Sequence, residues 1–205
     1  MSKLSTVLVS SILASGCAAD LATDTADQAL TAAPTIAALG MRGAPPAGGA
    51  TILVVGLDLD PAATVTYAGV DAASITACST SCTSAPYVGL VTTTPALAEG
   101  YVDLVVTNPD GQSATFPNFH IGPAPLVDSF APLATRKGKS LTITGNYFLT
   151  TPQVNIGGQI ARVTSSSATQ VVVTVPKLNV GAYPVFVTNP DTQFTRATDL
   201  LSITD

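Results

Sequence analysis

Short stretches of alternating apolar and polar residues recur along most of the chain. In 101–107 and in 140–144, every second residue is a leucine, an isoleucine or a valine. An alternation with a period of two predicts strands that bury one face. The segment 113–121 resumes the alternation after Asn108-Pro-Asp-Gly111, so we expect a hairpin around that turn.

Three blocks of sequence occur twice, in the same order. The paired blocks are 51–56 and 140–145, 65–69 and 154–158, and 105–110 and 186–191. The offset is 89 residues for the first two pairs and 81 residues for the third pair. The first copy therefore carries eight extra residues, in an interval that includes Cys78 and Cys82. An internal repeat of this kind indicates two structural units of one type.

Glycines mark strand ends and turns in these blocks. Gly56 and Gly145 close the first block, where a turn or a bulge requires a small residue. Gly111 follows Asn-Pro-Asp in the first copy and tolerates the positive φ of a tight turn. Thr192 replaces this glycine in the second copy, so we expect a different type of turn there.

Both copies resemble the IPT/TIG family of immunoglobulin-like domains. The shared marks are an opening Pro-x-Ile or Pro-x-Val (34–36 and 125–127), a glycine-ending second strand, a Val-x-x-x-Gly strand and a late Thr-Asn-Pro-Asp. Leu59 departs from the family's Gly-x-x-Phe in the first copy, whereas Phe148 keeps it in the second. The resemblance implies open two-sheet sandwiches of about seven strands each. It implies no enzyme activity, because the family mostly serves as binding, spacer or adhesion modules.

The predicted fold class is all-β, with two tandem immunoglobulin-like β-sandwiches after an N-terminal signal and tether. We place a lipoprotein-type signal peptide at 1–16, a flexible or weakly helical tether at 17–32, and the sandwiches at 33–122 and 123–205. Two prolines in the short linker Gly122-Pro-Ala-Pro125 make it stiff. We therefore expect the two sandwiches to form an extended rod.

The first residues have the pattern of an export signal: one lysine, a short apolar run ending at Ala14, and then Ser15-Gly16-Cys17. The end of this pattern resembles the lipobox of bacterial lipoproteins, although that family usually has leucine at the position of Ala14. The resemblance implies that Cys17 is lipidated and that the lipid is the only membrane contact. Cleavage near Ala18-Ala19 is the competing interpretation. The expected location is the outer membrane or cell surface, or alternatively the periplasm or the medium.

Charge argues against nucleic acid as a partner. The net charge is −5, and Lys and Arg together number only 8, too few to hold a phosphate backbone. Basic residues gather only at Arg136, Lys137 and Lys139, which we interpret as a solvated turn.

The cysteines divide into two groups by their positions. With Cys17 assigned to lipidation, Cys78 and Cys82 remain, and an exported protein meets an oxidising compartment. We predict a Cys78–Cys82 disulfide that closes the longer loop of the first copy rather than stabilising its core. In the chain-entropy model a bridge over so short a loop contributes about 2 kcal/mol or less.

The residues that could carry chemistry are few, and we predict no catalytic set and no cofactor. His120 is the only histidine, and we expect it at a strand end or between the sandwiches. Asp58 and Asp60 are candidate calcium ligands, although two loop carboxylates fall short of the six to eight oxygens that calcium takes. We otherwise predict no metal site.

Three tyrosines of the first copy are candidate binding residues. Tyr67, Tyr87 and Tyr101 could line one sugar- or peptide-binding surface, with ordinary strand packing as the alternative.

The sequence therefore predicts a non-catalytic cell-envelope protein that uses tandem immunoglobulin-like domains for binding, adhesion or spacing. The alternative is a carbohydrate-binding module that is accessory to polysaccharide binding or degradation. The expected partner is a protein or a glycan of the envelope, and the sequence does not predict an oligomeric state.

Lipidation can be tested by mass spectrometry of the protein purified from its host. We expect the mature chain to begin at an acylated Cys17, because the residues before it match a lipoprotein signal. A mature N-terminus at or beyond Ala18, without an acyl group, would contradict lipidation.

Overall fold

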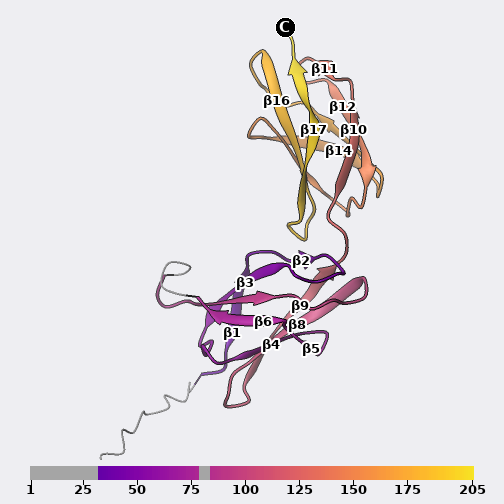
Figure 1. The fold of residues 1–205 in the computed structure, drawn as a ribbon. Helices are drawn as coiled ribbons and strands as arrows, with labels where there is room; N and C mark the ends of the chain where they lie inside the picture. Colours follow the sequence, from indigo (N-terminus) through magenta and orange to yellow (C-terminus); the bar gives the residue numbers. More distant parts are fainter. Residues whose placement is uncertain (1–31, 79–83) are drawn as a thin grey trace, which may run out of the picture.

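The computed structural model describes residues 32–78 and 84–205, and this part of the chain is all-β with no helix. Its strands form two β units, one above the other in Figure 1, which we call the N-terminal unit (32–122) and the C-terminal unit (123–205). Each unit has its own hydrophobic core. No helix in the described part is long and apolar enough to cross a membrane.

The N-terminal unit packs two antiparallel sheets face to face. Their strand orders are β1-β3-β7-β6 and β2-β9-β8-β4-β5, and only the β2–β9 pair is parallel. The strands are β1 (Thr35–Leu39), β2 (Gly43–Ala44), β3 (Thr51–Leu57), β4 (Thr64–Tyr67), β5 (Val70–Asp71), β6 (Ser74–Ala77), β7 (Val88–Thr93), β8 (Gly100–Thr107) and β9 (Ser113–Ile121).

The C-terminal unit repeats this plan with one difference. The strands are β10 (Leu126–Ala131), β11 (Ala134–Thr135), β12 (Ser140–Asn146), β13 (Gln153–Ile156), β14 (Gln159–Ser166), β15 (Gln170–Thr174), β16 (Gly181–Thr188) and β17 (Phe194–Ile203). The long strand β14 pairs with β13 at its start and with β15 at its end, so it joins the two sheets into one ladder. In the N-terminal unit, β5 and β6 occupy the corresponding stretch as two separate strands.

The alternation seen in the sequence produces the two cores. In β3, Ile52 and Val54 are fully buried, and in β12, Leu141 and Ile143 are fully buried, while their neighbours are more exposed. A period of two places these residues on the inner face of a strand, where their removal from water stabilises the fold.

Gly56 and Gly145 occupy equivalent places in β3 and β12, where the neighbouring strand shifts register by a bulge. A Cβ atom at either glycine would overlap a backbone carbonyl oxygen of the neighbouring strand. Leu59 and Phe148 cover these glycines and are 2% and 3% exposed. Leu59 therefore fills the place that phenylalanine has in the second copy, so the departure from Gly-x-x-Phe leaves the packing intact.

The asparagine of each Thr-Asn-Pro-Asp motif holds the loop after Gly56 or Gly145 through two hydrogen bonds. The side chain of Asn108 accepts the Asp60 N–H (3.0 Å) and donates to the carbonyl of Asp58 (2.8 Å). Asn189, which is 2% exposed, makes the same two bonds to the backbone of Leu149 and Tyr147 (3.0 and 2.8 Å). A buried amide is tolerated here because its hydrogen-bonding groups are satisfied.

The turn at Thr192 corrects one expectation from the sequence. Gly111 and Thr192 both donate an N–H to the carbonyl of the motif's asparagine, each at 2.9 Å. Both residues have positive φ, 87° for Gly111 and 69° for Thr192. The two turns are therefore of one type, and Thr192 holds a conformation that is unfavourable for a β-branched residue.

The extra residues of the first copy lie between β6 and β7. This connection spans 78–87, whereas the corresponding β14–β15 connection spans only 167–169. The disulfide between Cys78 and Cys82 stays a prediction because Cys82 lies outside the described residues. Cys17, the signal and the tether up to residue 31 also lie outside them.

Candidate functional site

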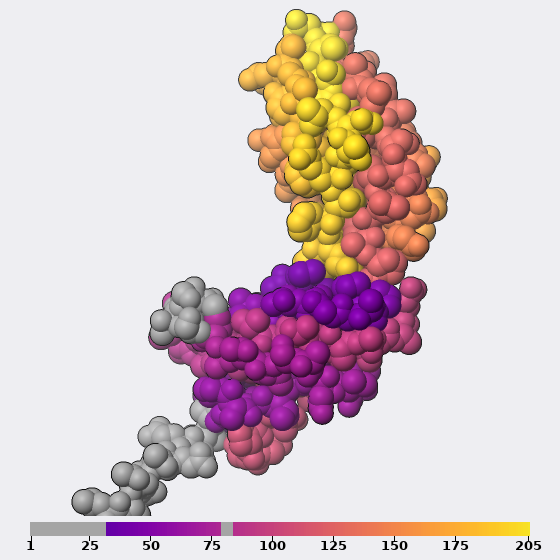
Figure 2. Space-filling model, viewed as in Figure 1, coloured from indigo at the N-terminus to yellow at the C-terminus, as the bar shows by residue number. Residues whose placement is uncertain are grey.

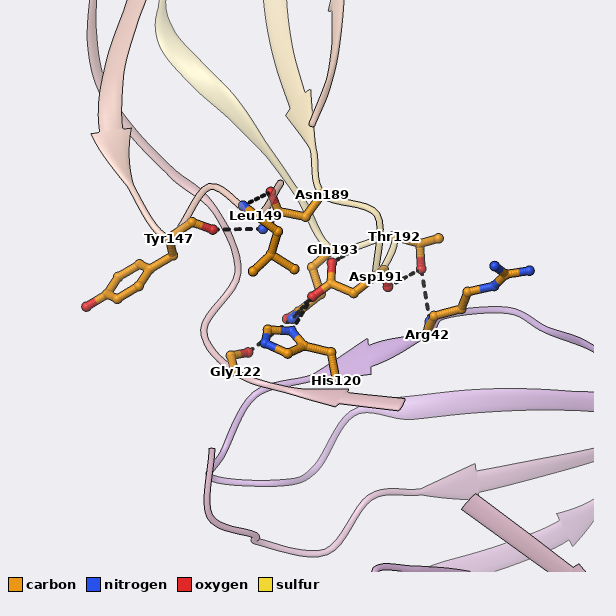
Figure 3. Close-up of polar contacts among 9 residues, drawn as sticks. All are labelled: Arg42, His120, Gly122, Tyr147, Leu149, Asn189, Asp191, Thr192 and Gln193. Carbon is orange, nitrogen blue, oxygen red and sulfur yellow. Dashed lines mark hydrogen bonds and ion pairs between the residues drawn. The ribbon is translucent and has the colours of Figure 1, made fainter. Parts of the chain in front are cut away.

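The two units meet where the turn between β16 and β17 of the C-terminal unit contacts the N-terminal unit. Figure 2 shows the upper unit upright on the lower one, with contact confined to a narrow area. Figure 3 shows the polar side chains of this area, which come from both units and from the linker between them. We call this contact the joint; its polar residues are Arg42, His120, Gly122, Asp191, Thr192 and Gln193.

A buried carboxylate lies at the centre of the joint. Oδ2 of Asp191 lies 2.6 Å from Nδ1 of His120, and the two side chains are 3% and 12% exposed. Among the described residues this is the only contact within ion-pair distance between an acidic side chain and a basic or histidine side chain, and it joins positions 71 residues apart. A buried carboxylate is costly unless it is paired and hydrogen-bonded, so the contact favours the docked arrangement.

Gln193 completes the set of partners of this carboxylate. Its backbone N–H donates to Oδ1 of Asp191 (3.0 Å), and its Nε2 donates both to Oδ2 (2.9 Å) and to the carbonyl of Gly122 (3.0 Å). The N–H of Gly122 in turn donates to the carbonyl of Ala44 (3.0 Å). The start of the linker therefore forms hydrogen bonds with both units.

Arg42 contributes its backbone to the joint. Its N–H points to the carbonyl of Asp191 (3.0 Å) and to the hydroxyl oxygen of Thr192 (3.1 Å). Thr192 thus gains a contact with the N-terminal unit that a glycine at this position would lack. Strained backbone at a contact between units suggests that the contact is functional.

Two glycines make room for the contact between His120 and Asp191. A Cβ atom on Gly43 would crowd the side chain of Asp191, and a Cβ atom on Gly122 would overlap the ring of His120. Neither glycine has a positive φ, so the available space, and not backbone conformation, explains why these positions are glycine.

The same turn occurs in the N-terminal unit without a partner unit. Asp110 accepts hydrogen bonds from the N–H (2.9 Å) and Nε2 (2.8 Å) of Gln112, just as Asp191 does from Gln193. These bonds hold the pKa of Asp110 below its ordinary value. Asp110 is exposed, whereas Asp191 is buried against the N-terminal unit. Docking therefore uses a turn that both units possess.

A groove of about 390 Å³ opens beside the joint. Both units contribute to its walls, which are formed by Arg42, Tyr101, Phe116, Pro117, Asn118, His120, Leu149, Thr150, Thr151, Pro190 and Asp191. Its volume lies within the range of small-molecule sites, which occur preferentially at domain interfaces.

Two aromatic rings arrange the side chains of this groove. The Tyr101 ring is 64% exposed and lies 5.0 Å from the ring of His120. The guanidinium of Arg42 lies 5.8 Å from the centre of the Phe116 ring. Asn118, which also lines the groove, has a φ of 59° at a bulge in β9, a feature that re-aims side chains near binding sites.

Comparison with known proteins assigns the C-terminal unit. Residues 125–203 match the family model of the IPT/TIG domain. The C-terminal unit is an IPT/TIG domain. A search of curated proteins gave no match.

The solved structures that match this chain are much longer than it is. The plexin A4 extracellular region is 18% identical, with 83% of this chain and 18% of that chain covered and a TM-score of 0.41. SGBP-B of the Bacteroides ovatus mixed-linkage glucan utilization locus, in complex with a mixed-linkage heptasaccharide, is 20% identical, with 83% and 45% covered and a TM-score of 0.39. The surface glycan-binding protein PbSGBP-B of Prevotella bryantii is 19% identical, with 83% and 42% covered and a TM-score of 0.38. The chain spans less than half the length of these proteins.

The three candidate tyrosines do not line one surface. Tyr67 is fully buried, with its ring edge against Phe119 and its hydroxyl 2.6 Å from Oγ1 of Thr92, so it packs the core and cannot reach a ligand. Tyr87 is 44% exposed beside Val88, which pairs with Gly56 at the end of the unit away from the IPT/TIG domain. Only Tyr101 lies in the groove.

The candidate calcium ligands remain a prediction. The carboxylate of Asp60 accepts the N–H of Ala62 (2.7 Å). Asp58 contributes a backbone carbonyl to Asn108. Within 32–78 and 84–205, no group of three or more His, Cys, Asp or Glu side chains is placed to hold a metal ion.

The basic loop lies on the IPT/TIG domain, far from the joint. Arg136, Lys137 and Lys139 line a cavity of about 430 Å³ together with the connection that includes Leu178 and Val180. The sequence predicts His120 at a strand end or between the sandwiches, and the structure has it near the end of β9 and in the joint. Asp191 ends the second Thr-Asn-Pro-Asp motif, and its contact with His120 depends on docking that no local motif reveals.

The burial of Tyr67 can be tested by alkaline titration. Burial raises the pKa of Tyr67 from 10.0 to about 12, against a smaller opposing effect of its bond to Thr92. One tyrosinate absorbance step should therefore come near pH 12, and stability should fall as pH rises above 10, because the unfolded state loses this proton first. Tyr67→Phe should remove the late step and Tyr101→Phe should retain it; a late step that persists in Tyr67→Phe would assign the shift to another tyrosine.

Proposed function

We propose that this chain is a non-catalytic cell-envelope protein that holds two immunoglobulin-like units in one fixed orientation for binding. The observation that carries the proposal is the joint, in which Asp191 of the IPT/TIG domain is bonded to His120 and Gln193. A simple flexible spacer would not require such a contact.

The cost of separating the units supports a fixed orientation. Undocking removes the His120 partner from Asp191 and the Gln193 partner from Gly122, while the strain at Thr192 remains. Hydrogen bonds to charged groups contribute about 1.5 to 3 kcal/mol each. Domains joined only by a linker would move freely, whereas these two share a hydrogen-bonded linker and a buried contact between His120 and Asp191.

His120 serves the contact between the units. Its Nδ1 is bonded to Asp191, and its ring lies against Gly122. A lipid at Cys17 would anchor the chain to the envelope, and a Cys78–Cys82 disulfide would suit an oxidising compartment. Both modifications are part of the proposal.

Removing the carboxylate at the joint tests the fixed orientation. Asp191→Ala should weaken docking by about 2 kcal/mol, because His120 loses its charged partner. Small-angle X-ray scattering should then show a broader distribution of distances than in the wild type. Asp110→Ala is the matched control, since it removes the same bonds to glutamine in an exposed turn, and it should leave the distribution unchanged. Identical scattering from Asp191→Ala and the wild type would contradict a joint that depends on this carboxylate.

A second candidate function is carbohydrate binding, which the groove favours. Tyr101 presents a largely exposed ring at the mouth of a groove that also contains hydroxyl and amide side chains. Exposed aromatic rings provide large contact areas for ligands with apolar faces, and sugar rings have such faces. The groove, rather than a flat sheet face, is the proposed site.

Substitution of two exposed tyrosines tests this candidate on a glycan array. Tyr101→Ala should lose most of the binding, because it removes the proposed stacking platform. Tyr87→Ala should bind as the wild type does, because Tyr87 does not line the groove. Equal losses in both variants, or binding unaffected by Tyr101→Ala, would exclude the groove as the sugar site.

A further inference from the structure

We infer that the groove at the joint selects glycans that carry a carboxylate, with Arg42 as the residue that binds the acidic group. The inference rests on the carbohydrate-binding candidate and adds the chemical class of the ligand. The sugar would stack on Tyr101 and place its carboxylate at the guanidinium of Arg42.

Arg42 has a backbone engaged at the joint and a side chain that is not. Its N–H bonds to Asp191 and Thr192, which fixes the position of its Cα atom against the IPT/TIG domain. Its guanidinium lies over the Phe116 ring, and no carboxylate in the described part of the chain forms an ion pair with it. An aromatic face orients a guanidinium while leaving its N–H groups available.

The charges that line the groove favour an anion. The lining carboxylate is that of Asp191, which is already bonded to His120 and to Gln193. The guanidinium of Arg42 therefore has no carboxylate partner among the described residues, and the carboxylate beside it in the groove already has its own partners. Planar guanidinium groups bind carboxylates through two parallel hydrogen bonds, which gives both energy and geometry.

The other lining residues suit a sugar better than a peptide. Tyr101, Asn118 and Thr150 are exposed residues that line the groove, and their side chains carry an aromatic ring, an amide and a hydroxyl. Peptides that bind β-sandwiches commonly add a strand along an open edge. Along this part of β9, Pro117 has no N–H and Asn118 has a positive φ, which prevents regular strand addition.

The groove requires both units. Leu149, Thr150 and Pro190 belong to the IPT/TIG domain, whereas Arg42 and Tyr101 belong to the N-terminal unit. The joint therefore completes the site, and ligand binding would in turn stabilise the docked arrangement.

The test uses the full mature chain and an array of uronic-acid oligosaccharides, each printed beside its carboxyl-reduced, neutral counterpart. We expect at least one acidic oligosaccharide to bind about tenfold or more tightly than its neutral counterpart. Arg42→Gln should remove this preference, since it removes the charge but keeps the backbone bonds of the joint. Arg162→Gln, at an exposed position on β14, is the matched control and should keep the preference.

The outcomes separate this inference from the function on which it rests. Equal binding of acidic and neutral members, lost in Tyr101→Ala, would overturn the acidic preference and leave carbohydrate binding intact. The absence of binding to every glycan would overturn both. Binding of a polyglutamate peptide with the same dependence on Arg42, and no glycan binding, would replace the sugar by an acidic peptide.

Discussion

The buried carboxylate of Asp191 is the constraint on which the arrangement of the two units depends. A buried carboxylate is costly unless it has hydrogen-bond partners. The partners of Asp191 come from its own turn and from His120 across the joint. The glycines at 43 and 122 make room for this contact, and the linker is bonded to both units. Orientation, groove and linker geometry therefore follow from one polar cluster.

The repeat explains how such a joint could be built from existing parts. In both units the asparagine of the Thr-Asn-Pro-Asp motif donates a hydrogen bond to a neighbouring loop. The aspartate of the motif accepts a hydrogen bond from the glutamine two residues later. In the IPT/TIG domain this preformed turn also receives His120. The fold supplies the turn, and Thr192, which stands where the first copy has Gly111, adds a hydrogen bond to the N-terminal unit.

Much of the fold followed from periodicity, because an alternation of two residues determines which face of a strand is buried. The repeat offsets located the longer connection correctly between β6 and β7. Burial of Tyr67 agrees with the alternative of ordinary strand packing, because Tyr67 lies two residues after the buried Val65 and therefore on the same face of β4. The pairing of His120 with Asp191 was hidden, since it depends on how two complete units dock and not on any local pattern.

Residual dipolar couplings measured on both units of the wild-type protein test the fixed orientation most directly. If the joint holds, one alignment tensor will fit the couplings of the N-terminal unit and of the IPT/TIG domain in the orientation seen here. Two tensors of clearly different magnitude would mean that the units move independently, which would contradict the account.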